Sequence, residues 1–380
     1  MNRSGDRATF GAQRPLPSLR RLLRLAPNRV WRTYTGGRTL DELAGAAPPA
    51  DGHFPEDWLA STTPARNPPR ADRETAAEPP EGISQLLLDG ATVDFRALLA
   101  ADPVGLLGET HVRRHGPDPR LLVKLLDPAI RLHFQVHPSA EFARLRLGAP
   151  SGKTEAYHVL AIRPEVADPG IFLGFRSPPA RDVLRRWIET QDVTAIEGAL
   201  NRVPVQAGDT YLVPGGVPHA LGAGVFLAEI QEPSDLVVRF EFERGGYVLP
   251  ESARFMGQDV EWALDVFDLS PWPSSRVAVT ARCPARRRRA LGPDSFQDDL
   301  IGPERTPCFR VRHSTVQAAV RKTEDSFHLL VVTAGAGTAH VAGETHALRP
   351  FDAFFVPAAL GPIHFEPSPH LHLLECYPPD

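Results

Sequence analysis

Residues 135–138 (Gln-Val-His-Pro) and 152–155 (Gly-Lys-Thr-Glu) decide how the whole chain is interpreted. Gln135 and His137 are two residues apart, so on a β-strand their side chains point to the same face. Pro138 cannot continue the hydrogen-bond ladder of a central strand. The pair is therefore expected at the end of a strand, beside a cavity.

Two further side chains extend this pair to a set of nitrogen and oxygen donors. Glu155 leads into a strand-like run at 156–160, and a turn at 213–218 (Val-Pro-Gly-Gly-Val-Pro) delivers His219. Two imidazoles, one carboxylate and one amide suit a divalent metal ion and leave room for water or a substrate. The alternative is a strand end whose polar groups are satisfied by neighbouring backbone. From these residues alone, both interpretations stay open.

Length and composition limit the possible classes of protein. The 380 residues are enough for two or three domain-sized units. The chain is 42% hydrophobic and 23% charged with a net charge of −4, so no nucleic-acid partner is expected. Its three cysteines form no Cys-x-x-Cys pair, which argues against a thiolate zinc site and a disulfide framework. No apolar run approaches the ~18 residues of a membrane span, and we expect a cytoplasmic protein without a membrane partner.

Short strand-like runs with Gly or Pro at their ends predict a mainly β chain with minor helical segments. The chain contains 30 Gly and 39 Pro, as many turns require. The runs over 121–136, 157–175 and 203–242 predict a β-sandwich or a closed double-sheet barrel. Helices are expected at 93–101, 138–146, 181–200 and 262–269.

The expected order of domains follows from these runs. A flexible segment at 1–25 precedes a metal-binding domain at 26–250, which has a Pro-rich loop at 60–82. A helix and a linker at 251–300 then lead to a C-terminal domain at 301–380. Four consecutive arginines at 286–289 could contact phosphate, but a solvated linker is the preferred interpretation.

An internal duplication is indicated by two stretches of the same form. Residues 208–214 (Gly-Asp-Thr-Tyr-Leu-Val-Pro) and 350–357 (Pro-Phe-Asp-Ala-Phe-Phe-Val-Pro) each contain an acid, an apolar strand and a proline. This pattern suggests two copies of one β-barrel unit. His219 follows Pro214 by five residues, whereas the corresponding position in the second copy is Pro362. We therefore expect the second barrel to be degenerate and free of metal.

Four motifs in this order resemble the type I mannose-6-phosphate isomerases (phosphomannose isomerases) of the cupin superfamily, and the compact length is similar to their short bacterial branch. The motifs are Leu-His-Phe-Gln-Val-His-Pro at 132–138, Gly-Lys-Thr-Glu at 152–155, Pro-Gly-Gly-Val-Pro-His-Ala at 214–220, and Glu-Ile-Gln-Glu-Pro-Ser-Asp at 229–235 with Arg239 after it. The resemblance is strongest over about residues 119–245.

This resemblance implies two cupin barrels (double-stranded β-helices, or jelly rolls), with the site in the first. The implied ligands of a catalytic zinc ion are Gln135, His137, Glu155 and His219. Lys153 would line the site, and Arg239 matches the arginine that the family places at the substrate. In that context a metal site is favoured over a plain strand end, although such ligands would also accept manganese, iron or cobalt.

The implied reaction interconverts mannose 6-phosphate and fructose 6-phosphate by proton transfer between C1 and C2 through an enediol. It would bring mannose into nucleotide-sugar synthesis. Lys153 could bind phosphate or transfer a proton, and Arg239 could instead pair with Glu229 or Glu241. No general base is assigned, and the chain could be a monomer or a homodimer.

Several positions depart from the family pattern and keep two alternatives open. His133 replaces a small residue and adds an imidazole near the metal, and residues 156–158 and 241–243 also differ. A related isomerase acting on another sugar or sugar phosphate is one alternative. A cupin that binds a sugar without turnover, as a regulator, is the other. The histidines elsewhere, including His370 and His372, are expected to be structural or exposed.

Overall fold

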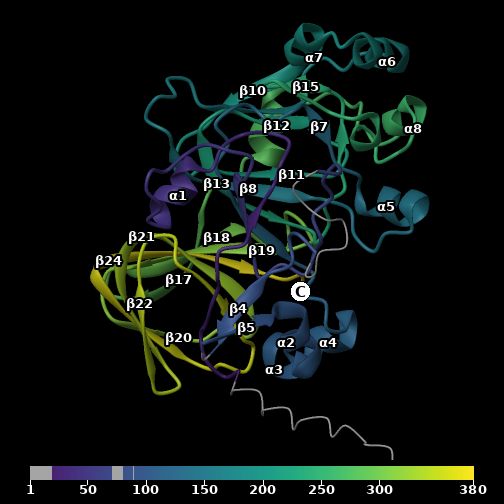
Figure 1. Cartoon of the computed structure of the whole chain (residues 1–380). Helices are drawn as coiled ribbons and strands as arrows, with labels where there is room; N and C mark the ends of the chain where they lie inside the picture. Colours follow the sequence, from purple (N-terminus) through teal and green to yellow (C-terminus); the bar gives the residue numbers. More distant parts are fainter. Residues whose placement is uncertain (1–18, 71–79, 89) are drawn as a thin grey trace, which may run out of the picture.

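The computed structural model describes residues 19–70, 80–88 and 90–380, in which two β-barrels lie one above the other (Figure 1). The first barrel consists of two antiparallel sheets, ordered β11-β8-β13-β6-β3-β2 and β10-β9-β12-β7-β14. The strands of the first sheet are β2 (Arg29–Val30), β3 (Glu56–Leu59), β6 (Leu122–Leu126), β8 (Glu155–Ile162), β11 (Thr210–Val213) and β13 (Val225–Gln231). Those of the second are β7 (Gln135–Val136), β9 (Gly170–Phe175), β10 (Leu200–Pro204), β12 (His219–Leu221) and β14 (Val238–Arg239).

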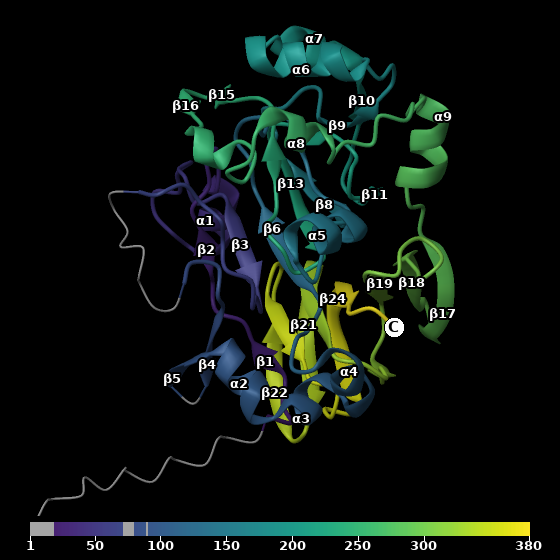
Figure 2. The same cartoon turned by 90° about the vertical axis from the view of Figure 1, so that its right-hand side faces the viewer.

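The second barrel is formed by one antiparallel sheet, drawn mainly in yellow-green in the lower half of Figure 2. Its order is β1-β23-β21-β24-β19-β18-β17, with β20 paired to β24 and β22 to β21. The strands are β1 (Leu23–Arg24), β17 (Arg286–Gly292), β18 (Ser295–Ile301), β19 (Arg310–Val316), β20 (Val320–Lys322), β21 (His328–Val341), β22 (Glu344–Leu348), β23 (Ala353–Val356) and β24 (Ile363–Tyr377). The predicted two-barrel, mainly β architecture is thus confirmed.

Short helices and two hairpins flank the barrels. The hairpins are β4 (Gln85–Leu88) with β5 (Ala91–Asp94), and β15 (Glu243–Arg244) with β16 (Tyr247–Val248). The helices are α1 (Arg38–Leu43), α2 (Phe95–Ala101), α3 (Pro103–Leu107), α4 (Glu109–His115), α5 (Ala140–Leu147), α6 (Arg181–Thr190), α7 (Val193–Ala199), α8 (Val260–Leu264) and α9 (Ser274–Arg276), with single turns at Glu251–Ala253 and Val277–Ala281. None of the helices in the described ranges is both long and apolar enough to cross a membrane.

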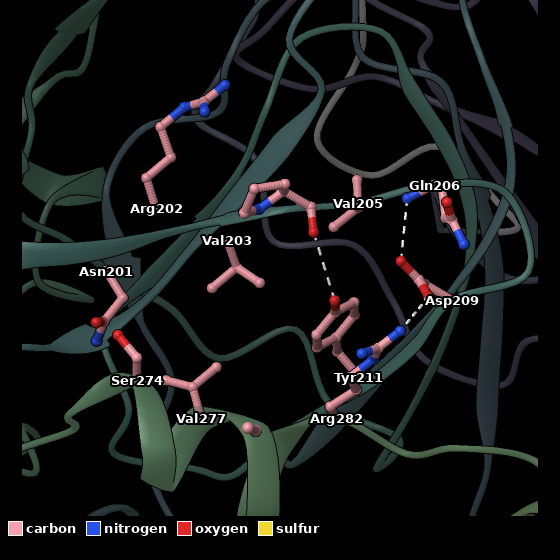
Figure 3. A pocket seen from close by; sticks show the side chains of 12 residues that line it. Asn201, Arg202, Val203, Val205, Gln206, Asp209, Tyr211, Ser274, Val277 and Arg282 are labelled. Atoms are coloured by element: carbon pink, nitrogen blue, oxygen red, sulfur yellow. Dashed lines mark hydrogen bonds and ion pairs between the residues drawn. The ribbon is translucent and has the colours of Figure 1, made fainter.

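A cavity of about 500 Å³ opens between β10, β11 and the helical turns around α9 (Figure 3). Its charged groups have ion-pair partners: Arg282 lies 3.4 Å from Asp209 in the lining, and Arg202 lies 2.8 Å from Asp168 outside it. The hydroxyl of Tyr211 points to the carbonyl of Pro204 at 3.5 Å. None of the predicted ligands lines this cavity.

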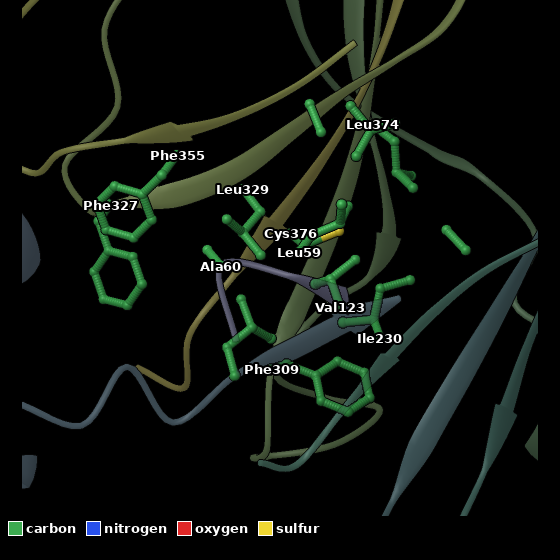
Figure 4. Close-up of a cluster of buried hydrophobic side chains, with 14 of the residues drawn as sticks. Leu59, Ala60, Val123, Ile230, Phe309, Phe327, Leu329, Phe355, Leu374 and Cys376 are labelled. Atoms are coloured by element: carbon green, nitrogen blue, oxygen red, sulfur yellow. The ribbon is translucent and has the colours of Figure 1, made fainter. Parts of the chain in front are cut away.

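The two barrels share an apolar cluster (Figure 4). Side chains alternate along each strand, so on β13 Ala228 and Ile230 face the second barrel while Leu227 faces the interior of the first. On β24, Leu374 faces the shared cluster and Leu373 faces the interior of the second barrel. The alternation therefore places every second residue of these strands inside a barrel.

Several predictions made from the sequence are wrong in detail. Residues 1–18 lie outside the described part, but residues 19–25 are ordered: Leu23 is buried and β1 pairs with β23. The arginines at 286–289 form β17, whose partner β18 supplies Asp298 and Asp299 for Arg287 and Arg288, so this run is not a linker.

The helix expected over 181–200 is divided into α6 and α7. Gln191 has a positive φ of 53° in the left-handed region, which ends α6, and Asp192 caps α7 through the backbone nitrogen of Ala195. The helix expected from residue 93 starts later, at Phe95, because Asp94 belongs to β5 and caps α2.

Candidate metal and substrate site

Three of the predicted ligands converge inside the first barrel. One ligand atom each from His137, Glu155 and His219 lies within 4.8 Å of the others. His137 Nε2 is 3.3 Å from Glu155 Oε2, and His219 Nε2 is 3.1 Å from Glu155 Oε1. All three side chains are buried. The structure therefore brings together three side chains that lie up to 82 positions apart in the chain.

The strand register explains this convergence. His219 is directly opposite Gln135 across the β7–β12 pair, and the Gln135 amide nitrogen lies 3.3 Å from His219 Nε2. His137 follows Gln135 by two residues and stays on the same side of the strand. Glu155 is the first residue of β8 and is opposite Val213, just before the turn that leads to His219. The fourth predicted ligand, Gln135, thus adjoins the other three.

Both imidazoles are held in a form suited to binding a cation. Nδ1–H of His137 donates to the carbonyl of Leu236 and that of His219 to the carbonyl of Val217, each at 2.8 Å. Nε2 of each ring is therefore left as an acceptor that faces the Glu155 carboxylate. Acceptors that converge in this way require a cation between them, so the donor set fits a divalent metal ion.

Electrostatics agree with this arrangement. Burial, followed by the ammonium of Lys153, lowers the pKa of His137 to about 3, so its ring is neutral. Burial tends to raise the pKa of Glu155, but Lys153 and the two imidazoles hold it well below its usual range. The site thus contains a neutral imidazole at His137 and an ionised carboxylate at Glu155, the forms in which these groups bind metals.

Lys153 lies at the centre of the cluster. Its ammonium is 2.7 Å from Glu155 Oε2, 3.0 Å from Glu229 Oε1 and 2.9 Å from His137 Nε2. Burial disfavours the charge, but the carboxylates of Glu155 and Glu229 outweigh it and raise the pKa of Lys153. Lys153 is therefore a buried, protonated group in contact with the ligand set.

A second layer of charged residues lies behind the ligands and was not assigned from the sequence. Lys124 on β6 lies 3.7 Å from Glu56 and 3.8 Å from Glu229. Burial raises the pKa of Glu229 to about 7, although Lys124 and Lys153 act to lower it. Glu229 can therefore gain and lose a proton near neutral pH. The sequence did contain a signal for these residues: each is a charged residue at an inward-facing position of an otherwise apolar strand.

Arg239 is buried in the same cavity, and it forms neither of the ion pairs considered from the sequence. Its Nη1 donates to the carbonyl of Ala253 at 3.1 Å. Glu241 is instead bound by Arg131 at 2.6 Å. Within residues 19–70, 80–88 and 90–380, no carboxylate pairs with Arg239. Burial, and then Arg32, lower its pKa to about 10, so it stays charged.

The contacts of Asp235 explain why Arg239 has no carboxylate partner among the described residues. The Asp235 carboxylate accepts two hydrogen bonds from Arg32, at 3.0 and 3.1 Å, and one from the backbone of Arg66 at 2.7 Å. Arg32 also lies 3.0 Å from Glu56. The carboxylates of Asp235 and Glu56 are thus already paired with Arg32. A buried guanidinium without a carboxylate is costly unless a ligand supplies one.

His133 adds an imidazole to this cavity, as predicted. Its Nδ1 donates to the carbonyl of Glu241 at 3.1 Å, and its buried Nε2 has no hydrogen-bond partner in the described structure. Burial, and then Arg239, lower the pKa of His133 to about 4, so the ring is neutral. Nε2 is therefore an open acceptor. The lining of the cavity includes His133, Gln135, His137, Lys153, Tyr157, Glu229 and Arg239.

Comparison with known proteins identifies relatives over most of the chain. No protein-family profile matches it. A mannose-6-phosphate isomerase of Streptococcus mutans is 30% identical over 251 residues, which are 65% of this chain and 71% of that protein. A probable mannose-6-phosphate isomerase of Bacillus subtilis, GmuF, is 35% identical over 125 residues, covering 33% and 38% of the two chains.

Solved structures agree with the architecture. The crystal structure of the mannose 6-phosphate isomerase from Bacillus subtilis has a TM-score of 0.72 at 19% identity and covers 94% of this chain and 99% of its own. A mutant phosphomannose isomerase from Salmonella typhimurium has a TM-score of 0.69 at 17% identity, covering 94% and 100%. At these identities the structures establish the shared fold, which is the predicted cupin fold.

Proposed function

Because this chain belongs to the mannose-6-phosphate isomerase family, we propose that it interconverts mannose 6-phosphate and fructose 6-phosphate. The observation that carries the proposal is a cluster of metal-binding side chains beside the unpaired, buried guanidinium of Arg239. One cavity thus offers a place for a cation and a positive group for an anionic sugar. Phosphorylated sugars do not cross membranes unaided, so we place the reaction in the cytoplasm.

His137, Glu155 and His219 would hold the metal, with Gln135 as the fourth ligand. We propose zinc, because imidazole nitrogens and a carboxylate oxygen are typical ligands of catalytic zinc, which can expand to five ligands and so admit the substrate. When bound, the metal ion supplies positive charge against the negative charge that develops on the sugar oxygens. The second layer of Glu56, Lys124 and Glu229 keeps this part of the barrel polar.

Glu229 and Lys153 are our candidates for moving the proton. Isomerisation removes a proton from C2 of mannose 6-phosphate and returns one to C1 through an enediol. A carboxylate with a pKa near neutrality is suited to both steps. The ammonium of Lys153, 3.0 Å away, stabilises the ionised form of Glu229 and can donate to a sugar oxygen.

Arg239 and His133 would orient the sugar. Arg239 lies opposite Gln135 across the β14–β7 pair, so its guanidinium enters the cavity next to the ligand set. There it can bind substrate oxygens and so gain the negative partner that the described part of the chain does not provide. His133 Nε2 can accept a hydrogen bond from a sugar hydroxyl. Since the family usually has a small residue at this position, His133 is the place where substrate choice could differ.

The decisive measurement is turnover of mannose 6-phosphate by purified protein, with and without a chelator, beside a metal analysis of the same sample. Chelator-sensitive formation of fructose 6-phosphate is expected, with zinc restoring the rate. Bound metal together with turnover of a different sugar phosphate would support the related-isomerase alternative. Bound metal without turnover of any sugar would contradict catalysis and favour a binding protein.

Removal of a ligand tests the site itself. His137→Ala and Glu155→Ala should each lose the metal and lower kcat/KM by more than about 100-fold, since altered outer contacts alone cost about 10–100-fold in metal sites. Circular dichroism should show a folded protein. His364→Ala, on the second barrel, is the matched control and should keep both metal and activity. A metal-free variant that retains activity would rule out the proposed mechanism.

A further inference from the structure

The second barrel repeats the strand register of the first. In chain order, β19, β20, β21, β23 and β24 take the places of β6, β7, β8, β11 and β13. In the first barrel, Glu155 is opposite Val213, the residue before Pro214. In the second, His328 is opposite Val356, the residue before Pro357. His328 is therefore the counterpart of the ligand Glu155.

The second layer of charges is repeated as well. Glu229 is opposite Tyr157 on one side and Lys124 on the other. Glu375 is opposite Leu330 on one side and Arg312 on the other. Glu375 is thus the counterpart of Glu229, and a basic residue faces each of them. The duplicated barrel has kept a buried polar layer at the positions that surround the metal cluster in the first barrel.

Lys322 is the cation of this second layer. It lies on β20, the counterpart of β7, and its ammonium contacts Glu375 Oε1 and lies 3.1 Å from Glu324 Oε1. His328 Nε2 is 3.7 Å from the same oxygen of Glu375. The side chains of Lys322, His328 and Glu375 are all buried. Together with Glu324 they line a small cavity inside the barrel.

The ring of His328 is oriented in the same way as that of His137. Its Nδ1 donates to the carbonyl of Ser326 at 3.3 Å, which leaves Nε2 as an acceptor facing the carboxylate of Glu375. Burial lowers the pKa of Lys322 to about 7, and the Glu324 carboxylate opposes this effect. The ammonium therefore relies on the surrounding acids to keep its charge at neutral pH.

Two positions of the metal cluster carry different residues in the second barrel. His219 is paired with Gln135 in the first barrel, whereas Ile363 is paired with Lys322 in the second. By strand register the counterpart of His219 is therefore Ile363, one residue after the Pro362 expected from the sequence. The second barrel thus has an isoleucine in place of an imidazole and a lysine in place of an amide. One ligand has been lost and one fixed positive charge has been gained.

We propose that the second barrel contains a cation site equivalent to the metal site, in which the ammonium of Lys322 occupies the place of a divalent metal ion. Glu324, His328 and Glu375 are the groups that this cation holds together. Removing the ammonium should therefore convert the second barrel into a divalent-metal site.

The test is metal binding by Lys322→Ala. Wild type and variant are stripped with chelator, incubated with Co²⁺ or Zn²⁺, freed of excess metal by gel filtration and analysed for metal per chain. The variant is expected to bind one equivalent more than the wild type, whatever the wild type binds. Without metal, the melting temperature of the variant should be lower than that of the wild type, and added metal should raise it again. Because only the difference in stoichiometry is used, the result does not depend on isomerase activity.

Matched variants separate this proposal from a simple loss of stability. Arg321→Ala changes the exposed neighbour on β20 and should bind no additional metal. Lys322→Ala with His328→Ala should lose the additional equivalent. If Lys322→Ala does not fold, Lys322→Gln, with the amide that stands on β7 of the first barrel, replaces it. A folded Lys322 variant that binds no additional Co²⁺ or Zn²⁺ overturns the proposal.

Discussion

Single buried charges, held at fixed points on the strands, account for most of the chemistry proposed for this chain. Lys153 and Glu229 are buried in the same cavity, yet one is held protonated and the other titrates near neutrality because their neighbours differ. Arg239 has a backbone partner and no carboxylate within the described ranges. These differences set which group can bind an anion and which can move a proton.

A prediction at this scale concerns the open acceptor of His133. His133→Ala should raise KM for mannose 6-phosphate and lower kcat/KM about fivefold, because one hydrogen bond of roughly 1 kcal/mol is lost. His133→Gln, whose amide oxygen can accept the same bond, should recover part of the loss. Steady-state kinetics of both variants check this. An unchanged KM in His133→Ala would show that no hydroxyl binds there.

The candidate metal ligands could be selected from the sequence, whereas the residues behind them could not. Gln135, His137, Glu155 and His219 occur in short motifs whose order is diagnostic. The contacts of Lys124 with Glu56 and Glu229 depend on the register of strands far apart in the chain, which no local pattern specifies. The same holds for the pairing of Asp235 with Arg32, which leaves Arg239 free of a carboxylate.

Among the elements, the loop before β8 depends on a glycine. A Cβ on Gly152 would lie 2.4 Å from the backbone nitrogen of Ala140 and 2.7 Å from the carbonyl oxygen of Pro138. The loop therefore packs directly against the turn after His137 and brings Lys153 and Glu155 to the site. The backbone nitrogen of Lys153 donates to the same carbonyl at 3.0 Å.

Gly152→Ala should consequently displace the two elements that carry ligands. We expect a fall in kcat/KM of at least tenfold and weaker metal retention, measured by kinetics and metal analysis. Gly198→Ala is the matched control, because nothing lies within 4 Å of its added methyl group and the residue is in α7. The control should keep full activity and gain up to about 1 kcal/mol of stability. Equal activity in the two variants would refute the packing argument.

Element boundaries were the weakest part of the sequence prediction, for local reasons. The apolar spacing over 181–200 was that of a helix on both sides of Gln191, but a single left-handed residue divides it. The strand expected over 130–136 is reduced to Gln135–Val136. The backbone of Phe134 donates there to the carboxylate of Glu241, a side-chain contact from the segment between β14 and β15. Apolar spacing indicates the type of an element but not such competing contacts.

The strands that join the barrels carry a row of histidines with a predicted pH effect. His158 on β8, His313 on β19 and His372 on β24 follow one another, with ring centroids 6.3 and 5.3 Å apart. Burial, and then His313, lower the pKa of His158 to about 3. Between about pH 3 and pH 6.5 the unfolded chain therefore binds a proton that the folded chain does not, so stability rises with pH over this window.

Replacing His158 should remove this dependence. His158→Gln can keep the hydrogen bond to Thr210. On going from pH 7 to pH 5, the free energy of unfolding of the wild type should fall by roughly 2 kcal/mol more than that of this variant. Denaturant unfolding at the two pH values measures the difference. His364→Ala serves as the control and should follow the wild type. Parallel pH profiles for His158→Gln and the wild type would contradict the assignment.

At the scale of the whole molecule, the first and the last of the described strands lie in the same barrel. β1 pairs with β23, and Leu19 and Leu23 join the apolar cluster shared by both barrels. Helix α2 also packs there, with Phe95 at 5.2 Å from Phe355. The second barrel is therefore completed by segments that precede the first barrel in the sequence.

Truncation tests this dependence. Deleting residues 1–25 should destabilise the second barrel by on the order of 4 kcal/mol, because buried leucines and the β1–β23 pair are lost. Hydrogen exchange of the β23 amides should increase. A deletion of residues 1–18, which ends before the first described residue, is the control for shortening the chain. Equal thermal stability of the two deletions would show that β1 adds nothing.

The pairing of β1 with β23 also has a consequence for synthesis. Arg24 and Asp352, which form an ion pair across it, are 328 residues apart. At ribosomal rates of about 5–20 residues per second, β1 emerges on the order of tens of seconds before its partner. During that delay the leucines around it have no native surface to cover them. A ribosome-bound chain that already contains a complete first barrel would still present an apolar N-terminal strand, and so a binding site for a chaperone.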